Sequence, residues 1–317
     1  MRKKNNRFLS LAALGTAAAL TLGACAEGAE DEDTSTTEDD ADDQDAGEQI
    51  GDGEEISIAV HGGWPEGVAV TYIWKKALED QGFEVEVGDE AEAGPNYAAL
   101  AGGDFDLNFD MWLPLTHKDY WEEYGDDLEK LGVWYDDAVL TIAVNEDAPI
   151  DSLDELADHA DDFDNRIVGI EPGAGLMQVT KEDAMPTYGL EDMELVESST
   201  PAMLAELAGA TDAGDDIVVT LWRPHWAYDE YPVRDLEDPE GAMGEAEEIY
   251  TVGRDGFSEE FPEVAEAIEA FELTDDQLFS LENIMFNEEE DDGEDPEGSV
   301  EKWLEDEENQ EFFDSIF

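Results

Sequence analysis

Apolar residues follow two patterns along the chain from residue 55 onward. Short apolar or alternating runs predict strands, and apolar positions spaced three and four residues apart predict helices. The expected strands lie at residues 56–60, 83–87, 105–109, 139–144, 166–170, 195–199, 216–220 and 248–252. The expected helices lie at residues 68–81, 97–101, 152–160, 201–210, 262–271, 275–285 and 300–313, and a further helix opens at 171–177.

The order of these elements predicts an α/β protein with a mostly parallel sheet and helices on its faces. Residues 139–144 and 248–252 are interpreted differently, as strands that connect two strand–helix units. We therefore expect one lobe at residues 55–138 plus 253–317 and a second lobe at residues 139–252. The two connecting strands bring the end of the chain back to the first lobe.

The first 54 residues are not expected to join either lobe. A basic start and an apolar stretch at residues 8–22 are typical of a signal peptide over residues 1–24, and the stretch is short for a stable membrane span. The motif LGAC at residues 22–25 resembles the bacterial lipobox, in which the cysteine is lipidated and becomes the first residue. Cys25 is the one cysteine in the chain, so no disulfide can form within it. An ordinary secretory signal with an incidental cysteine is the other interpretation.

The segment from 25 to 54 is nearly all acidic, small or hydroxylated, and it has no apolar periodicity. Like charges extend such a segment, so we expect a disordered acidic tether. With a lipidated Cys25, the tether predicts a protein anchored on the extracellular face of the cell membrane.

Acidic residues dominate the chain, with 88 Asp and Glu against 14 Lys and Arg in 317 residues and a formal net charge of −74. Binding of nucleic acid needs a basic face, so no nucleic-acid partner is expected. Salt screens repulsion between surface carboxylates, so the excess acid suits a saline medium. A calcium-binding surface is the alternative, although no calcium loop of the required spacing is found. The 41% of hydrophobic residues is enough for a sizeable core.

Three tryptophans follow expected strands. Trp64, Trp112 and Trp222 each stand near a proline and a histidine, after the strands at 56–60, 105–109 and 216–220. Ligands of open α/β sheets bind beyond the carboxyl ends of the strands. Several aromatic walls with a few polar groups are what a quaternary ammonium ligand needs.

A second site feature is the glycine-rich turn before the helix that opens at 171–177. Gly175 and Leu176 would present backbone N–H groups at the start of that helix. Such a helix start favours an anion, including a carboxylate.

These motifs carry a family resemblance. A lipoprotein signal and two α/β lobes with two crossings resemble the substrate-binding protein of an ABC importer. The segments 112–120 (WLPLTHKDY), 169–177 (GIEPGAGLM) and 221–226 (LWRPHW) are similar to those of the glycine betaine (OpuA-type) binding proteins. Segments 198–203 (SSTPAM) and 236–239 (LEDP) add to this likeness, which covers roughly residues 55–315.

The resemblance implies a two-lobed periplasmic-binding-protein fold of type II with two crossover strands, and a monomer that docks on an ABC permease. It implies an extracellular receptor for glycine betaine that serves osmoprotection, with no enzyme activity, no cofactor and no metal. By this resemblance Trp64, Trp112 and Trp222 form the cage around the trimethylammonium group. The ligand carboxylate is then held by the N–H groups of Gly175 and Leu176 and by the side chain of His117.

Some alternatives remain open at this stage. An acidic residue two positions after a cage tryptophan meets the ligand hydroxyl in related choline-binding proteins, so Glu66 would suit choline, unless it only caps the following helix. Choline, carnitine, proline betaine or a sulfonium analogue are thus other possible ligands. Trp226 and His225 either border the pocket or pack beside it. An enzyme is another class, but the sequence contains none of the usual nucleophile motifs. A metal-binding lipoprotein is a further class, but the sequence has only four histidines, and they are scattered without ligand spacing.

Overall fold

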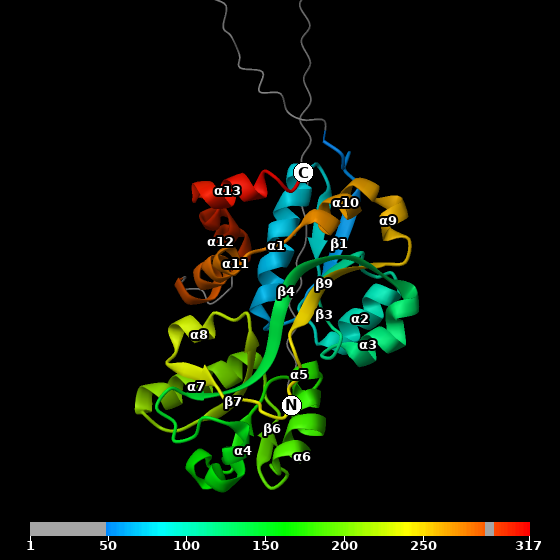
Figure 1. Cartoon of the computed structure of the whole chain (residues 1–317). Helices are drawn as coiled ribbons and strands as arrows, with labels where there is room; N and C mark the ends of the chain where they lie inside the picture. Colours follow the sequence, from blue (N-terminus) through cyan, green and yellow to red (C-terminus); the bar gives the residue numbers. More distant parts are fainter. Residues whose placement is uncertain (1–48, 289–294) are drawn as a thin grey trace, which may run out of the picture. The chain divides into compact units, whose positions relative to one another are not determined.

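The computed structural model describes residues 49–288 and 295–317 (Figure 1). The expected signal peptide, Cys25 and most of the expected acidic tether lie outside the described residues. The first lobe contains β1 (Glu55–Ala59), α1 (Pro65–Asp80), β2 (Glu84–Val87), α2 (Ala93–Ala101), β3 (Leu107–Leu113), α3 (Lys118–Tyr124) and a 3-10 turn (Gly125–Asp127). It is completed by α9 (Phe257–Glu260), α10 (Pro262–Ala270), α11 (Asp275–Glu282), a π-helical turn (Asn283–Glu288), α12 (Pro296–Trp303) and α13 (Glu307–Phe313).

The second lobe contains α4 (Leu153–Leu156), a 3-10 turn (Ala157–Phe163), β5 (Arg166–Val168), α5 (Gly175–Val179), a π-helical turn (Thr180–Ala184), α6 (Met185–Tyr188) and β6 (Glu194–Val196). It continues with α7 (Thr200–Ala213), β7 (Val218–Arg223), α8 (Ala227–Glu230) and β8 (Val233–Asp235). Two long strands, β4 (Leu128–Asn145) and β9 (Glu247–Arg254), run between the lobes (Figure 1).

A single path of paired strands connects the two lobes, in the order β2-β1-β3-β9-β4-β7-β5-β6, with β8 paired to β4. β1 pairs in parallel with β2 and β3, and β5 pairs in parallel with β6 and β7. The connecting strands pair antiparallel with their neighbours. The sheet is therefore parallel within each lobe and antiparallel where the lobes join.

β4 changes partner along its length, and this change joins the lobes. Its residues from Leu128 to Ala138 pair with β9, whereas those from Val139 to Asn145 pair with β7 or β8. The sequence pattern predicts the connecting strand only at residues 139–144. β4 begins eleven residues earlier than that (139 − 128), and the earlier part is half exposed and less apolar, so its pattern is weaker. β9 pairs throughout with β3 and β4, although residues up to 252 were assigned to the second lobe.

The structure corrects the ends of several expected elements. β3 and β7 end at Leu113 and Arg223, so Trp112 and Trp222 lie inside strands and not after them. A proline follows each of these strands, and it has no N–H to continue the ladder. The expected helix 300–313 is two helices, α12 and α13, with a break at residues 304–306.

α1 is the central helix of the first lobe. Pro65 occupies its first turn, where a missing N–H costs no hydrogen bond, and the helix packs against β2, β3, α11 and α12. Trp74 is fully buried and stacks on Phe109 with 5.7 Å between ring centroids. This packing fixes the N-terminal end of α1, which carries two residues of the site described below.

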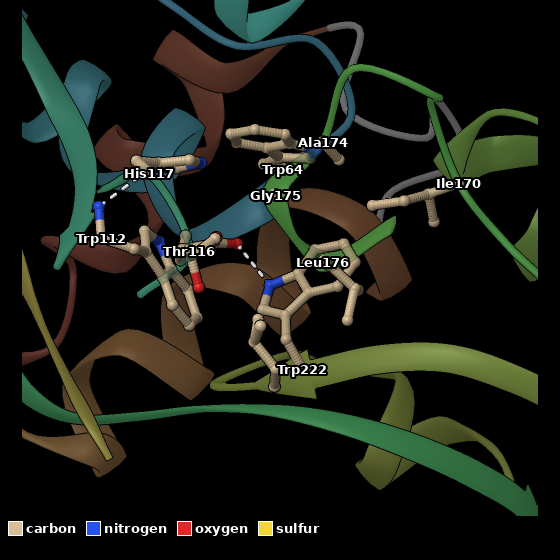
Figure 2. Close-up of a pocket in the computed structure, with 11 residues that line it drawn as sticks. Trp64, Trp112, Thr116, His117, Ile170, Ala174, Gly175, Leu176 and Trp222 are labelled. Atoms are coloured by element: carbon tan, nitrogen blue, oxygen red, sulfur yellow. Dashed lines mark hydrogen bonds between the residues drawn. The ribbon is translucent and has the colours of Figure 1, made fainter. Parts of the chain in front are cut away.

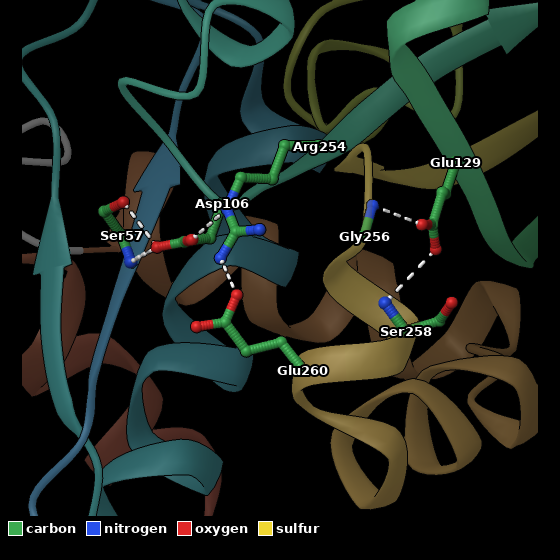
Figure 3. A network of polar contacts seen from close by, with 7 residues as sticks. All are labelled: Ser57, Asp106, Glu129, Arg254, Gly256, Ser258 and Glu260. Carbon is green, nitrogen blue, oxygen red and sulfur yellow. Dashed lines mark hydrogen bonds and ion pairs between the residues drawn. The ribbon is translucent and has the colours of Figure 1, made fainter.

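One arginine ties the far end of the first lobe together (Figure 3). Arg254, at the end of β9, donates to Asp106 at 2.7 Å and to Glu260 at 2.6 Å. Asp106 also accepts from the backbone and hydroxyl groups of Ser57, both at 2.7 Å. Glu129 of β4 accepts from the backbone N–H groups of Gly256 and Ser258, which follow Arg254 in the chain. In a chain so short of cations, this arginine joins β1, β9 and the loop before β3.

The core also contains a carboxyl group without a counter-ion. Glu282, the last residue of α11, is fully buried, and neither oxygen has a hydrogen-bond partner of normal geometry among the described residues. Burial raises the pKa of Glu282 to about 8, and the charge of Asp229 adds to the rise. The folded protein therefore binds this proton more tightly than the unfolded chain does. The proton stabilises the fold at low pH, and this stabilisation is lost as the pH rises through about 8.

We therefore expect Glu282→Gln to be less sensitive to alkali than the natural protein. The melting temperature of the natural protein should fall between about pH 6 and about pH 9, and that of the variant should fall a few degrees less. Thermal unfolding in high salt, followed by circular dichroism, measures both. Glu301→Gln, at an exposed position of α12, is the control and should melt like the natural protein. Equal pH dependence of Glu282→Gln and the natural protein would contradict the assignment.

Candidate ligand-binding site

A small pocket lies between the lobes (Figure 2). All six residues predicted from the sequence border it. The lining residues are Trp64, Glu66, Trp112, Thr116, His117, Leu140, Ile170, Ala174, Gly175, Leu176 and Trp222.

The three tryptophans come from three different elements. Trp64 is the N-cap residue of α1, whereas Trp112 lies in β3 and Trp222 in β7. Trp222 pairs with Leu140 of β4, at the point where β4 enters the second lobe. Each of the three tryptophans is at most 7% exposed, so the indoles are shielded from bulk water. The three indoles thus line one pocket, because the connecting strands bring β3 and β7 to one place.

Two of the indole N–H groups donate to buried carboxyl groups. Trp112 Nε1 donates to Asp110 Oδ1 at 2.8 Å, and Trp222 Nε1 donates to Glu66 Oε2 at 3.0 Å. Trp64 Nε1 has no hydrogen-bond partner among the described residues, and its ring stacks on His117 with 5.5 Å between centroids. The hydrogen bonds hold two rings of the cage in orientation.

Glu66 therefore belongs to the pocket wall, and is more than a helix cap. It stands in the first turn of α1 and is 1% exposed, with its carboxyl group directed to Trp222 of the other lobe. Burial raises the pKa of Glu66 well above its ordinary value, and the charges of Asp110 and Glu282 raise it further.

His117 presents a hydrogen-bond donor to the pocket. The backbone N–H of Trp112 donates to His117 Nδ1 at 3.0 Å, and a backbone N–H cannot accept. Burial lowers the pKa of His117 well below its ordinary value, and the neighbouring His61 adds to this effect. A neutral ring whose Nδ1 accepts must carry its proton on Nε2. Nε2 is buried without a partner among the described residues, so it is available to an acceptor in the pocket.

The start of α5 supplies further donors from the second lobe. Gly175 and Leu176 are the first two residues of α5, so their N–H groups have no acceptor within the helix. The helix approaches the first lobe so closely that a Cβ at position 175 would lie 1.9 Å from the backbone oxygen of Thr116. Only glycine permits this approach of the two lobes.

Other hydrogen bonds cross between the lobes beside the pocket. Tyr120 of α3 donates to the backbone oxygen of Gly173 at 2.8 Å, and Gln178 of α5 donates to Asp119 at 2.9 Å. Together with the pair of Trp222 and Glu66, they describe a closed arrangement of the lobes.

Glu247 positions the loop that carries Thr116 and His117. This carboxylate, at the start of β9, accepts from the backbone N–H groups of Leu115 at 2.6 Å and Thr116 at 2.9 Å, and also from the Thr116 hydroxyl. Sequence reasoning missed Glu247 because 131 residues separate it from Thr116. Asp110 was missed too, although an acid between apolar residues of a strand is a usable signal.

Trp226 and His225 do not border the pocket. Trp226 lines a separate groove together with Tyr72, Leu204 and Phe286, which is lined from both lobes. His225 accepts from the backbone N–H of Ala227 at 3.0 Å and packs edge-on against Trp222. His225 therefore supports Trp222 from outside the pocket, whereas Trp226 belongs to the separate groove.

Two α/β lobes joined by two strands, with a small closed pocket between them, define a two-lobed ligand-binding protein. The fold is the type II periplasmic-binding-protein fold that the motifs imply. The lactococcal OpuAC, solved in its closed form with glycine betaine, superposes with a TM-score of 0.75 at 29% identity, covering 83% of this chain and 99% of that one. A choline binding protein of an ABC transporter, solved with choline, superposes with a TM-score of 0.72 at 27% identity, covering 81% and 89%.

The sequence comparisons agree with the structural ones. The family model for the substrate binding domain of ABC-type glycine betaine transport systems matches residues 54–306, and the chain belongs to this family. The glycine betaine/carnitine transport binding protein GbuC of Listeria monocytogenes is 35% identical over 159 residues. That match spans 50% of this chain and 50% of GbuC, so the chain spans about half the length of this relative. Within the described residues, no helix has the length and apolar character needed to cross a membrane.

The tautomer of His117 is directly measurable. We expect its ring to remain neutral, with the proton on Nε2, from about pH 8 to about pH 5, since burial disfavours the imidazolium. Long-range ¹H–¹⁵N NMR spectra of the ligand-free protein report the tautomer, and His117→Asn assigns the signal. A protonated Nδ1 or a titration in this range would contradict the geometry.

Proposed function

We propose that this protein is the substrate-binding component of an ABC importer and that it binds glycine betaine between its lobes. One observation carries the proposal, namely that a single closed pocket contains three indoles together with unpartnered N–H donors. Indoles suit a quaternary ammonium group, and the donors suit a carboxylate. Glycine betaine has both groups within a few bonds.

The proposed contacts divide between the two ends of the ligand. Each indole of Trp64, Trp112 and Trp222 contributes roughly 0.5–2 kcal/mol through cation–π attraction when the cation is desolvated. The carboxylate accepts from His117 Nε2 and from the start of α5 at Gly175, where the helix dipole also favours an anion.

Choline is the second candidate, and a specific observation favours it. Glu66 borders the pocket with a buried carboxyl group, and a hydroxyl could donate to it. The match to a choline-bound structure also supports this candidate. Choline has no carboxylate that could accept from the donors at His117 and α5, and for this reason we prefer glycine betaine. Carnitine and proline betaine also carry a cation and a carboxylate, so they are further candidates of the same chemical class.

A metal-binding lipoprotein receives no support from the part of the chain that the structure describes. No group of three or more His, Cys, Asp or Glu there could hold a metal ion.

The proposed transport role follows from the two-lobed site. A ligand that contacts both lobes stabilises the closed state over the open one, which gives the membrane permease a signal to recognise. A separate ATPase subunit would supply the energy.

We further propose that a lipid on Cys25 anchors the protein as a monomer at the extracellular face. Its acidic surface suits a saline habitat, in which uptake of an osmoprotectant is useful.

Calorimetric titration of the purified protein in high salt tests the ligand. Glycine betaine should bind, and Trp112→Ala should weaken it roughly 30- to 300-fold, since an indole and its buried area are lost. Trp121→Ala, which removes a half-buried tryptophan outside the pocket, is the matched control and should bind normally. Tight choline binding with weak betaine binding would instead identify a choline receptor. Binding of neither would exclude a quaternary ammonium receptor.

Gly175→Ala tests the closed arrangement. The added methyl group collides with the backbone of Thr116, so the lobes cannot close fully, and betaine affinity should fall roughly 10- to 100-fold. Gly209→Ala is the control, because a Cβ at that position of α7 meets nothing within 4 Å. Small-angle scattering with saturating betaine should show that only Gly175→Ala stays more open. Closure of that variant to the natural dimensions would refute this role of Gly175.

A further inference from the structure

Two buried acids hold the indoles of the cage through hydrogen bonds. Asp110 and Glu66 are 2% and 1% exposed, and each accepts from the indole N–H of one cage tryptophan. Asp110 Oδ2 has no hydrogen-bond partner among the described residues. The two residues lie close together, since a Cβ on Gly67, the neighbour of Glu66, would be 2.4 Å from Asp110 Oδ2.

The acids have no positive partner in the described part of the chain. No lysine or arginine side chain is buried there. The titratable groups packed around the pair are Tyr97 of α2, His117 after β3 and Glu282 of α11. His117 is neutral, as shown above, so none of these three groups carries a positive charge.

Orientation of the indoles alone does not account for acids at these positions. Glutamine or asparagine has a carbonyl oxygen that accepts from an indole N–H equally well. A carboxyl group is costlier to bury, because its charged form loses water and finds no counter-ion. A pair of buried acids without a counter-ion therefore suits a ligand that brings a positive charge.

We propose that Glu66 and Asp110 form the charge-selecting element of the pocket, which pairs with a cationic head group and polarises the indoles of Trp222 and Trp112 toward it. This inference rests on the proposed function for the identity of the ligand, but it concerns any compact cation in the cage. An ionised acceptor on an indole N–H makes the ring face more negative, which strengthens cation–π attraction. In a low-dielectric pocket the two carboxyl groups also attract the cation directly.

Binding of a cation is expected to change the protonation of Asp110 and Glu66. Burial raises the pKa of Asp110 to about 7, and Glu66 is also shifted upward. A cation favours the ionised form of a neighbouring carboxyl group and so lowers its pKa. Binding should therefore release protons near neutral pH, and affinity should increase as the pH rises from about 6 to about 8.

The experiment compares ligands that carry the ammonium charge with one that lacks it. Glycine betaine, tetramethylammonium and 3,3-dimethylbutanoate, in which carbon replaces the ammonium nitrogen of betaine, are titrated calorimetrically into the full chain. Each titration is run in phosphate and in Tris, whose different ionisation enthalpies reveal the protons released. Glu66→Gln and Asp110→Asn keep an acceptor for the indoles. Glu247→Gln is the structural control, because its carboxylate holds the Thr116 loop and no indole.

The natural protein should release on the order of half a proton near pH 7 on binding either cation. Glu66→Gln should weaken betaine roughly 10- to 100-fold and leave 3,3-dimethylbutanoate within about threefold. Asp110→Asn should act in the same direction, and Glu247→Gln should weaken both carboxylates equally. The measurement on the natural protein decides the matter even where a variant does not fold.

Two results would overturn the proposal while the function stands. One is betaine binding without proton release, and the other is equal loss of affinity for betaine and for 3,3-dimethylbutanoate in both acid variants. Binding of tetramethylammonium with proton release but no binding of betaine would support the charge-selecting pair and refute the betaine function. If no cation binds the natural protein, both proposals fail.

Discussion

The approach of α5 to the loop after β3 is the contact on which the pocket depends. Gly175 meets the backbone of Thr116 with no room for a side chain, and this contact brings the donors of the second lobe to the cage of the first. The loop is held in turn by Glu247. Because Glu247 belongs to β9, a connecting strand, the hinge and the pocket share one hydrogen-bond network. Movement of the lobes therefore cannot leave the site unchanged.

Acid serves two opposite purposes in this molecule. Most of the carboxylates are exposed, where water and salt screen them at little cost. Glu66, Asp110 and Glu282 are buried instead, without a basic partner in the described residues. Burial makes each of these groups costly to ionise, and only a ligand of opposite charge offsets this cost at the pocket. The overall charge of the chain therefore gives no indication of these three groups.

Two proteins of similar fold were solved in complex with glycine betaine and with choline. The fold alone therefore does not select the ligand, and the selection depends on the groups in the pocket. Here the neutral His117 with a proton on Nε2 offers a donor, and Glu66 offers an acceptor to its tryptophan partner. The donors and the acid act on different parts of a zwitterion, so both are compatible with one ligand.

The sequence by itself determined the class of fold, and it named six of the eleven residues that line the pocket, because periodicity and long local motifs report on local structure. It misplaced Trp112 beyond its strand, since Asp110 looked like the end of an apolar run, and it shortened β4, whose first half is only partly buried. Only the tertiary structure decided that Glu66 joins Trp222, that Glu247 holds the Thr116 loop and that His117 is a donor. These facts depend on residues far apart in the chain and on burial, and no local pattern of side chains contains that information.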